Sequence, residues 1–415
     1  MSIDFEEIDP QRAIAQEQME RFAPDLAVTL LVDHAVRLGA SDLFLASEEN
    51  QVRVSVRHLG IVREVARMSN EQGARCMFHI RAAAGLKYDE RRKPQDGRWV
   101  RRRKAGQAVD LRINTMPTLH GESMAIRVLV RDSHLLSLEA LGMAAPQLGL
   151  LKSWLQSPSG LILVTGPTGS GKTTTLYACL SQLNDGRRKI HTIEDPIEYA
   201  IDGLLQSQVD DLNGPDFRQL LRAVLRQSPD VLMVGELRDM AAAETAVRAA
   251  NSGQLVFATL HAPVAVGAIQ SMLGMGIHPH FLCNSLLGVI GQRLVRTLDP
   301  ETKVPLDLSS APRTFDEVRP WLEDGQGEVV YAAAEDGTDR EGYRGRCGIY
   351  EMLNMSPALR EMVFAGRSSS DLVRKAIEEG MLDFRRASLL KVAQGATSFD
   401  EILRVVPAAD QWVGR

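Results

Sequence analysis

The segment GPTGSGKT, residues 166–173, decides the fold of the larger part of the chain. It matches the pattern G-x-x-x-x-G-K-[ST] and stands between the apolar run LILVT, 161–165, and a helical segment, 173–183. Strand, glycine-rich loop and helix in this order direct backbone N–H groups and a helix N-terminus at phosphate oxygens. The sequence therefore predicts a loop that binds the phosphates of a nucleotide.

Two side chains of this loop have distinct expected roles. Lys172 would contact the β- and γ-phosphates, and the hydroxyl of Thr173 would bind Mg²⁺. The alternative is a glycine-rich turn that carries a lysine by accident, but that does not explain the flanking strand and helix. We therefore expect ATP and Mg²⁺ as cofactors. The residues assigned to the nucleotide are Gly166, Pro167, Thr168, Gly169, Ser170, Gly171, Lys172, Thr173 and Thr174.

Continuous apolar runs recur around and after this loop. They occupy residues 161–164, 231–234 and 255–258, and helical stretches separate them. Runs of this kind are typical of a parallel sheet that is buried on both faces. The sequence thus predicts an α/β domain, and such sheets bind their ligands at the C-terminal ends of the strands.

A glutamate follows one of these strands directly. Glu236 comes after VLMVG, 231–235, and is our first choice for the catalytic base, because hydrolysis needs a group that orients water near the γ-phosphate. The Asp that usually holds Mg²⁺ through water is replaced by Gly235, so the Walker B element is atypical. A solvated glutamate at a strand end is the alternative interpretation.

A second acidic cluster and a histidine follow two further strands. In HTIEDPIEY, 191–199, Glu194 could hold the metal or the attacking water, and the alternative is an ordinary acid in a surface loop. His261, after LVFATL, could donate to a γ-phosphate or be a buried strand-end histidine. Because the C-terminal ends of parallel strands share one edge, we expect these groups to converge on one crevice.

Composition narrows the class of protein. The 415 residues suffice for two or three domains, and 44% hydrophobic with 24% charged residues is ordinary for a soluble globular protein. A net charge of -5 gives no overall positive field that would favour nucleic acid. The 4 cysteines form no CxxC pair, so neither a disulfide framework nor a thiolate zinc site is indicated. The N-terminal residues lack signal-peptide character, and we expect a cytoplasmic location.

Changes of pattern divide the chain into five segments. A helix is predicted over 26–38, strands over 51–60 and 61–68, a helix over 71–86, and strands over 110–114 and 123–130. These elements precede the α/β core as an α+β domain. The predicted segments are an N-terminal extension (1–24), a small α+β domain (25–132), the α/β core (133–299), a loop-rich insertion (300–346) and a helical C-terminal region (347–415).

Four segments in this order resemble the secretion and pilus-assembly ATPases of type II secretion and type IV pilus machines. They are GPTGSGKTTTLY, TIEDPIEY, LRAVLRQSPDVLMVGELRD and ATLHA. The resemblance extends from about Leu26 onward. It implies a RecA-like P-loop core after a small PAS-like α+β domain, and a hexamer that binds ATP between subunits. It also implies peripheral association with the inner membrane and an inner-membrane platform protein as partner. No transmembrane segment is expected, because no stretch of the sequence reaches about 18 apolar residues.

The resemblance also implies that arginines of the small domain reach the phosphates. Carried over by motif, they are Arg98 in QDGR, Arg112 in DLRIN and Arg127 in MAIRV. A guanidinium suits this role because it is always charged and forks onto phosphate oxygens. An ordinary surface strand is the alternative. The basic run 91–104 is not interpreted as a nucleic-acid site, because Trp99 is its only aromatic residue.

Several positions depart from the family's pattern. The stretch after QRLVR lacks the two CxxC pairs of a zinc site, so we expect no zinc. Phe44 stands where the family's SDIH element has His, and Leu59 stands where RxDG has Asp. Gln254 replaces a usual His. These changes leave the phosphate loop intact and concern contacts of the small domain.

The favoured function is a Mg²⁺-dependent ATP hydrolase that powers pilus assembly or protein secretion through domain motion within a ring. A nucleic-acid translocase is the first alternative, and it would show ATP turnover that DNA or RNA stimulates. A non-hydrolysing scaffold subunit of the secretion machine is the second. No nucleic acid is expected as a partner.

Overall fold

The structure is a computed structural model of the chain that describes residues 14–87, 89–102, 108–130, 137–210, 214–308, 313–334 and 342–406. The chain divides into two compact units, which are considered separately. Unit 1 contains Met1–Asp132, and unit 2 contains Ser133–Ala334 and Gly342–Arg415. The start of the predicted extension, the boundary predicted at 132/133 and the end of the basic run lie outside the described residues.

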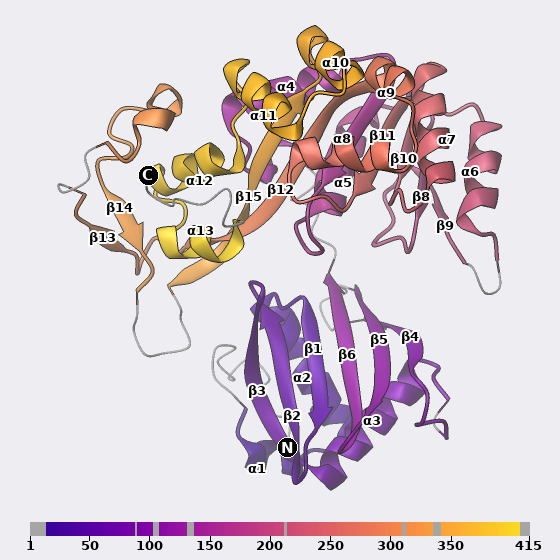
Figure 1. Ribbon diagram of the computed structural model, residues 1–415. Coiled ribbons are helices and arrows are strands. Elements are labelled where there is room, and N and C mark those ends of the chain that lie inside the picture. Colours follow the sequence, from indigo (N-terminus) through magenta and orange to yellow (C-terminus); the bar gives the residue numbers. More distant parts are fainter. Residues whose placement is uncertain are drawn as a thin grey trace. The chain divides into compact units, whose positions relative to one another are not determined.

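Unit 1 is an antiparallel sheet with helices packed on one face (Figure 1). Its strand order is β3-β2-β1-β6-β5-β4. Alternate residues of the strands are buried beneath the helices, as the period of a strand requires, and the described helices all lie on that face. The opposite face is called the open face below. The elements are α1 (Gln16–Arg21), α2 (Pro24–Leu38), β1 (Asp42–Ser47), β2 (Gln51–His58), β3 (Ile61–Ser69), α3 (Asn70–Ala83), β4 (Gln95–Arg102), β5 (Ala108–Thr118) and β6 (Gly121–Val130).

Two of these strands were not predicted from the pattern. β1 is a central strand, where Leu43 and Leu45 are buried and the residues between them face the open side. β4 is an edge strand within the basic run, and none of its residues is fully buried. An edge strand of this kind lacks the apolar alternation from which strands are predicted, and its charges protect the edge from pairing with other chains.

Unit 2 contains a larger sheet in the order β15-β12-β7-β11-β10-β8-β9. All neighbouring pairs are parallel except β12 with β15, which is antiparallel. The predicted apolar runs form central strands, and their alternate residues enter two separate cores. The strands are β7 (Gly160–Thr165), β8 (Ile190–Glu194), β9 (Leu205–Gln208), β10 (Val231–Val234), β11 (Leu255–Leu260), β12 (Leu286–Leu298) and β15 (Tyr343–Asn354).

Helices cover both faces of this sheet (Figure 1). α4 (Ala145–Leu155) and α5 (Lys172–Leu183) contribute to one core. The other core is formed with α6 (Phe217–Leu225), α7 (Met240–Asn251), α8 (Ala265–Gly274), α9 (Pro279–Ser285), α10 (Pro357–Phe364) and α11 (Ser369–Glu378). Burial on both faces explains why the strands consist of continuous apolar residues.

The C-terminal part of unit 2 joins the same sheet. β15 spans position 346, where a segment boundary was predicted, and it pairs with β12 over most of its length. A smaller core beside β12 includes Phe315, Val318 and Val330. Its surroundings are the two-stranded sheet of β13 (Val304–Leu306) and β14 (Val330–Ala332), the turn η4 (Asp316–Trp321), α12 (Phe384–Ala393) and α13 (Phe399–Val405).

Candidate phosphate site

The phosphate loop connects β7 to α5, as the sequence predicted. Its tip, Pro167–Gly169, is exposed, whereas Ser170 is buried. The ammonium of Lys172 lies over the loop and donates to the carbonyl oxygens of Gly166 at 2.8 Å and Pro167 at 3.1 Å. Partial burial lowers the pKa of Lys172 below the usual lysine value, and the nearby carboxylate of Glu236 partly opposes this. The lysine ammonium is therefore held beside the first two residues of the phosphate loop.

A glutamine from a strand that is distant in sequence forms hydrogen bonds with the phosphate loop. Gln292 of β12 is fully buried, and its Nε2 donates to the carbonyl of Ser170 at 2.6 Å. Its Oε1 accepts from the hydroxyl of Thr175 in the first turn of α5, at 2.8 Å. Gly171 has φ +87, and a Cβ there would lie 2.9 Å from the Gln292 Nε2. The glycine and the glutamine therefore fit together, and sequence reasoning missed the glutamine.

A threonine joins the ends of two neighbouring strands beside the loop. The hydroxyl of Thr165, the last residue of β7, donates toward Ala262 O at 2.9 Å and accepts from Ala262 N at 2.7 Å. Ala262 follows His261 directly. These bonds fix the end of β11 against the start of the phosphate loop, and thereby fix the backbone that carries His261.

The structure brings Glu236 and His261 together. Nε2 of His261 lies 3.0 Å from Oε1 of Glu236. Arg238 donates from Nε to the other oxygen of Glu236 at 2.8 Å and from Nη1 to Asp195 at 3.0 Å. The chain Asp195–Arg238–Glu236–His261 thus crosses the C-terminal ends of β8, β10 and β11. No role was predicted for Arg238 or Asp195. Asp195 directly follows Glu194, and Arg238 lies two residues after Glu236.

There is a steric reason for glycine at position 235. A Cβ at this position would lie 3.1 Å from the carbonyl oxygen of Ile193 and 3.4 Å from the Cα of Glu194. Both atoms belong to the backbone of β8 and cannot move easily. The neighbouring strand therefore occupies the space that the usual aspartate would need, which explains the atypical Walker B element.

Glu194 lies deeper than Glu236. It is 3% exposed, and its carboxylate accepts from Tyr177 on α5, from Thr192 at 2.6 Å and from Gln206 at 3.1 Å. Burial raises the pKa of Tyr177, and the negative charge of Glu194 raises it further, so the phenol is a permanent donor here. Glu194 therefore links α5 to β8 and β9, while its assignment to metal or water stays a prediction.

The three predicted arginines of unit 1 lie in one row across the open face of its sheet. Arg98 of β4 stands opposite Arg112 of β5, which stands opposite Arg127 of β6. Arg98 also pairs with Asp110 at 2.7 Å. Like charges directly opposite each other destabilise a sheet. Carboxylates on the same face offset part of this repulsion, since Asp110 pairs with Arg98 and Asp42 lies beside Arg127, and the role of the row toward phosphates stays a prediction.

Magnesium fits the chemistry of the phosphate site in unit 2. Thr173, in the first turn of α5, is half-buried and supplies a hydroxyl, a hard oxygen donor of the kind that Mg²⁺ prefers. No group of three or more His, Cys, Asp or Glu residues within the described ranges could form a cage. Phosphate oxygens would therefore complete the coordination, as is usual for Mg²⁺ with nucleotides.

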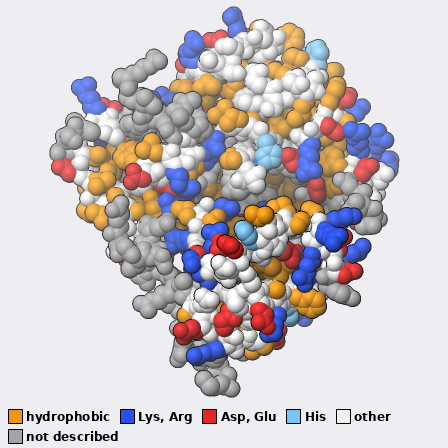
Figure 2. Space-filling view, turned by 60° about the horizontal axis from the view of Figure 1, so that its bottom comes forward, with side chains coloured by type: hydrophobic (Ala, Val, Ile, Leu, Met, Phe, Trp, Pro, Cys, Tyr) orange, Lys and Arg blue, Asp and Glu red, His pale blue; other side chains and the backbone are white. Residues whose placement is uncertain are grey.

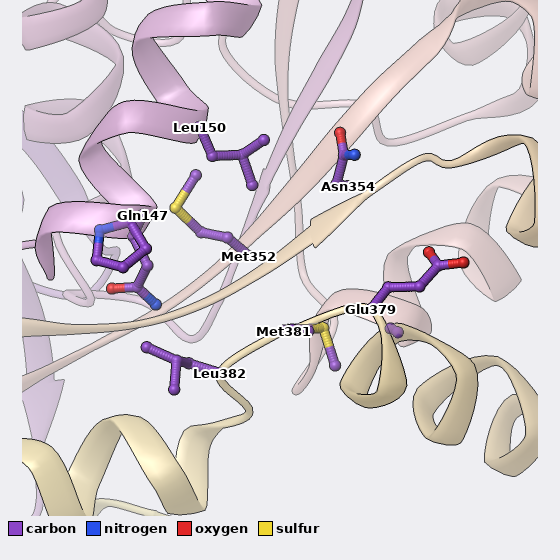
Figure 3. Close-up of a pocket in the computed structure, with 10 residues that line it drawn as sticks. Gln147, Leu150, Met352, Asn354, Glu379, Met381 and Leu382 are labelled. Atoms are coloured by element: carbon purple, nitrogen blue, oxygen red, sulfur yellow. The ribbon is translucent and has the colours of Figure 1, made fainter. Parts of the chain in front are cut away.

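Two other surfaces do not compete with this site. In Figure 2, Lys and Arg side chains of the described residues are mixed with acidic and apolar ones. A pocket of about 160 Å³ lies between α4, β15 and the end of α11 (Figure 3). Methionine and leucine side chains such as Met352 and Leu150 line it, and the side chain of Gln147 already donates to Tyr350 O at 2.7 Å. No residue of the phosphate site lines this pocket.

No helix among the described residues has the length and apolar character that crossing a bilayer requires.

Two solved structures resemble the chain. The Legionella pneumophila ATPase DotB has a TM-score of 0.70 at 19% identity and covers 95% of this chain and 98% of its own. The pilus retraction motor PilT with bound ADP has a TM-score of 0.61 at 26% identity, covering 90% of this chain and 95% of its own. They confirm the predicted fold, a RecA-like core with a small α+β domain.

Sequence comparisons give the family. The type II secretion system ATPase E of Vibrio cholerae is 41% identical over 380 residues, 91% of this chain and 74% of that protein. The type IV pilus assembly ATPase PilB of Pseudomonas aeruginosa is 38% identical over 410 residues, 97% of this chain and 72% of that protein. The family described as "Type II/IV secretion system protein" matches residues 17–404. The chain therefore belongs to the type II/IV secretion system protein family, and its phosphate loop places it among the ATPases of that family.

Proposed function

We propose that the protein is a Mg²⁺-dependent ATPase that forms a hexameric ring and powers the assembly of a type IV pilus or of a type II secretion pseudopilus. The observation that carries this proposal is the group Asp195–Arg238–Glu236–His261 at the strand ends, next to a phosphate loop with an intact Lys172. The similarity of the chain to the type II secretion ATPase of Vibrio cholerae and to the type IV pilus assembly ATPase of Pseudomonas aeruginosa supports it.

Each residue of the site has a proposed part in hydrolysis. Backbone N–H groups of residues 166–174 and Lys172 bind the phosphates, and Thr173 holds Mg²⁺, which neutralises charge that develops on the phosphates. Glu236 accepts the proton of the attacking water, for which an exposed strand end gives access. His261, bonded to Glu236, donates to the γ-phosphate and orients the base. Arg238 fixes the second oxygen of Glu236, so the carboxylate has one orientation.

The arginine row of unit 1 supplies the second half of the proposed site. In a ring, the arginine row of one subunit would contact the phosphates that the core of a neighbouring subunit holds. The row consists of Arg98, Arg112 and Arg127. Closure around ATP and opening after hydrolysis would then move one unit against another, because only the intact triphosphate offers the full set of contacts. This motion would act on a platform protein in the inner membrane, where the cytoplasmic ring binds peripherally.

Two substitutions test hydrolysis. Lys172→Ala should abolish ATP binding and turnover. Glu236→Gln should bind ATP with nearly unchanged affinity and release phosphate about 100-fold more slowly or worse, the range expected for a general base. Glu244→Gln, at an exposed position of α7, is the matched control. Turnover of Glu236→Gln at the rate of the unmodified protein would overturn the assignment, and an inactive unmodified protein would favour a scaffold.

The ring and the machine need separate measurements. Light scattering after gel filtration with a non-hydrolysable ATP analogue and Mg²⁺ should give the mass of six chains, and a persistent monomer would contradict the ring. Phosphate release should not increase when DNA or RNA is added, whereas a translocase would respond. Complementing a strain that lacks the gene, followed by assays of surface pili and of secreted protein, distinguishes pilus assembly from secretion.

A further inference from the structure

The arginine row of unit 1 continues beyond Arg127. Asp42 of β1 stands opposite Arg127, and Arg57 of β2 stands opposite Asp42, so the row crosses five neighbouring strands. Oδ1 of Asp42 lies 3.6 Å from Nε of Arg127, and Oδ2 lies 3.3 Å from Nε of Arg57. The hydroxyl of Ser41 also donates to Oδ2 at 2.9 Å. One carboxylate therefore holds two guanidinium groups.

The two arginines are not held equally. The guanidinium of Arg57 has the shorter contact with Asp42 and also lies 5.5 Å from the ring centroid of Phe44, within the range of a cation–π contact. Arg127 has the longer contact and a side chain that is 54% exposed. Of the two, Arg127 is therefore the one that can leave Asp42 at small cost.

We propose that Asp42 is a resident counter-anion that a phosphate of the nucleotide displaces from Arg127, and that Arg57 sets the ease of this exchange by sharing the same carboxylate. This inference rests on the proposed role of the arginine row in binding the nucleotide. Arg127 exchanges a long, exposed ion pair for a forked bond to phosphate. Asp42 keeps Arg57 and Ser41 as partners, so the exchange leaves no charge unpaired. Asp42 and Arg57 are thus positioning residues.

The exchange predicts opposite effects for the two residues. Asp42→Asn removes the competitor of the phosphate, so ATP affinity should increase about two- to fivefold, the range that an exposed ion pair supports. Arg57→Gln leaves the whole charge of Asp42 to Arg127, so affinity should decrease by a similar factor. In the double variant the effect of Arg57→Gln should vanish, because it acts through Asp42.

The experiment uses the full chain with a fluorescent, slowly hydrolysed ATP analogue and Mg²⁺, at two salt concentrations. The increase for Asp42→Asn should be larger at low salt, since screening weakens the competing ion pair. Arg53→Gln is the matched control, because Arg53 lies on β2 and pairs with Glu48 at 2.8 Å, outside the row. Thermal unfolding checks that each variant is folded.

The outcomes separate this inference from the proposed function. An Asp42→Asn variant with unchanged or lower affinity overturns the exchange, and so does an Arg57→Gln effect that persists in the double variant. Arg127→Gln tests the row itself. If Arg127→Gln leaves affinity and turnover unchanged, the row does not bind the nucleotide and the proposed function of unit 1 fails. If Arg127→Gln weakens binding while Asp42→Asn has no effect, only the exchange fails.

Discussion

The side-chain amide of Gln292 donates to the carbonyl oxygen of Ser170 at 2.6 Å, from a strand more than a hundred residues later in the chain. Its other end accepts from Thr175, so the amide holds both the last part of the phosphate loop and the first turn of α5. The site is buried, so water cannot easily replace the amide at the Ser170 carbonyl, whereas the Thr175 hydroxyl has a second side-chain hydrogen bond, with Tyr350. β12 therefore determines the shape of the phosphate loop.

Gln292→Leu should impair nucleotide binding. It leaves the Ser170 carbonyl buried without this bond, at about 1–3 kcal/mol, and takes one of two side-chain partners from the Thr175 hydroxyl, so the loop must shift to find new partners. We expect ATP affinity to fall at least about tenfold, measured by titration with a fluorescent analogue. Gln156→Ala, at the exposed end of α4, is the control. Affinity equal to that of the unmodified protein would show that the loop keeps its shape without the amide.

Gly235→Ala should destabilise unit 2. The added Cβ meets the backbone of β8 at 3.1 Å, so one of two central strands must move. Overpacking of this kind costs about 1–3 kcal/mol, which denaturant unfolding followed by circular dichroism measures. Gly274→Ala, in α8, is the control, because nothing lies within 4 Å of its Cβ and alanine favours a helix. Equal stability of the two variants would rule out the steric explanation.

Leu59→Asn should stabilise unit 1. Leu59 has φ 49 in the turn between β2 and β3, and Gly60 has φ 84. A left-handed conformation costs leucine about 1–2 kcal/mol, whereas Asn adopts it more easily and Asn-Gly is favoured in such hairpin turns. We expect an increase in Tm of a few degrees for the transition of unit 1 in calorimetry. Leu59→Ala keeps the strain, and a Tm for Leu59→Asn no higher than that of Leu59→Ala would refute this account.

The sequence predicts which residues lie together at one edge of the sheet, because the parallel sheet is buried on both faces. Strands β7, β10 and β11 are continuous apolar runs, and the residues that follow them must lie at one edge, so Glu236 and His261 could be placed together. Arg238, two residues after Glu236, was missed because its role depends on the direction in which its side chain points, toward Glu236 and Asp195. Gln292 left a weak signal, since it directly follows the run LLGVIG, 286–291, but Arg293 and Arg296 make the rest of this strand polar as well.

The arginine row was predicted only as separate residues. Arg112 and Arg127 face each other because the turn between Thr118 and Gly121 sets the register of β5 and β6, which a hairpin analysis could have found. Arg98 needed β4, an edge strand without apolar alternation. Asp42 comes from β1, which is not adjacent to β6 in sequence, and such long-range pairing leaves no local pattern.

Glu401→Gln should make stability less dependent on pH. Burial alone would raise the pKa of Glu401, but hydrogen bonds from Arg404 and Arg296 outweigh it and hold the pKa below 4.5. The carboxylate therefore stabilises the fold above about pH 4.5, and this contribution is lost as the pH falls through the lowered pKa.

The size of the effect follows from Arg296, which is only 10% exposed and would lose its ion pair with Glu401, while its contact with the Tyr343 ring at 3.9 Å remains. We expect Glu401→Gln to lower the free energy of unfolding by about 3–5 kcal/mol at pH 7, and the difference should shrink below pH 4.5. Denaturant titrations at several pH values measure it, with Glu378→Gln on α11 as an exposed control. A difference that stays constant with pH would mean that the charge of Glu401 does not stabilise the fold.

Arg238→Gln should slow hydrolysis more than it weakens ATP binding. Its guanidinium holds Glu236 with one nitrogen and Asp195 with another, so its loss frees the carboxylate of the base to rotate while the phosphate loop is untouched. We expect kcat to fall about tenfold or more, as for a misplaced catalytic group, with a smaller change in the ATP concentration at half-maximal rate. Arg238→Lys keeps the charge but not the forked guanidinium, so it should recover only part of the rate.

Arg218→Gln is the control for Arg238→Gln. Arg218 pairs with Asp239 at 2.8 Å, and in the pairs described it contacts neither Glu236 nor Asp195. If Arg238→Gln instead raised the half-maximal ATP concentration at constant kcat, the arginine would bind the nucleotide rather than orient Glu236.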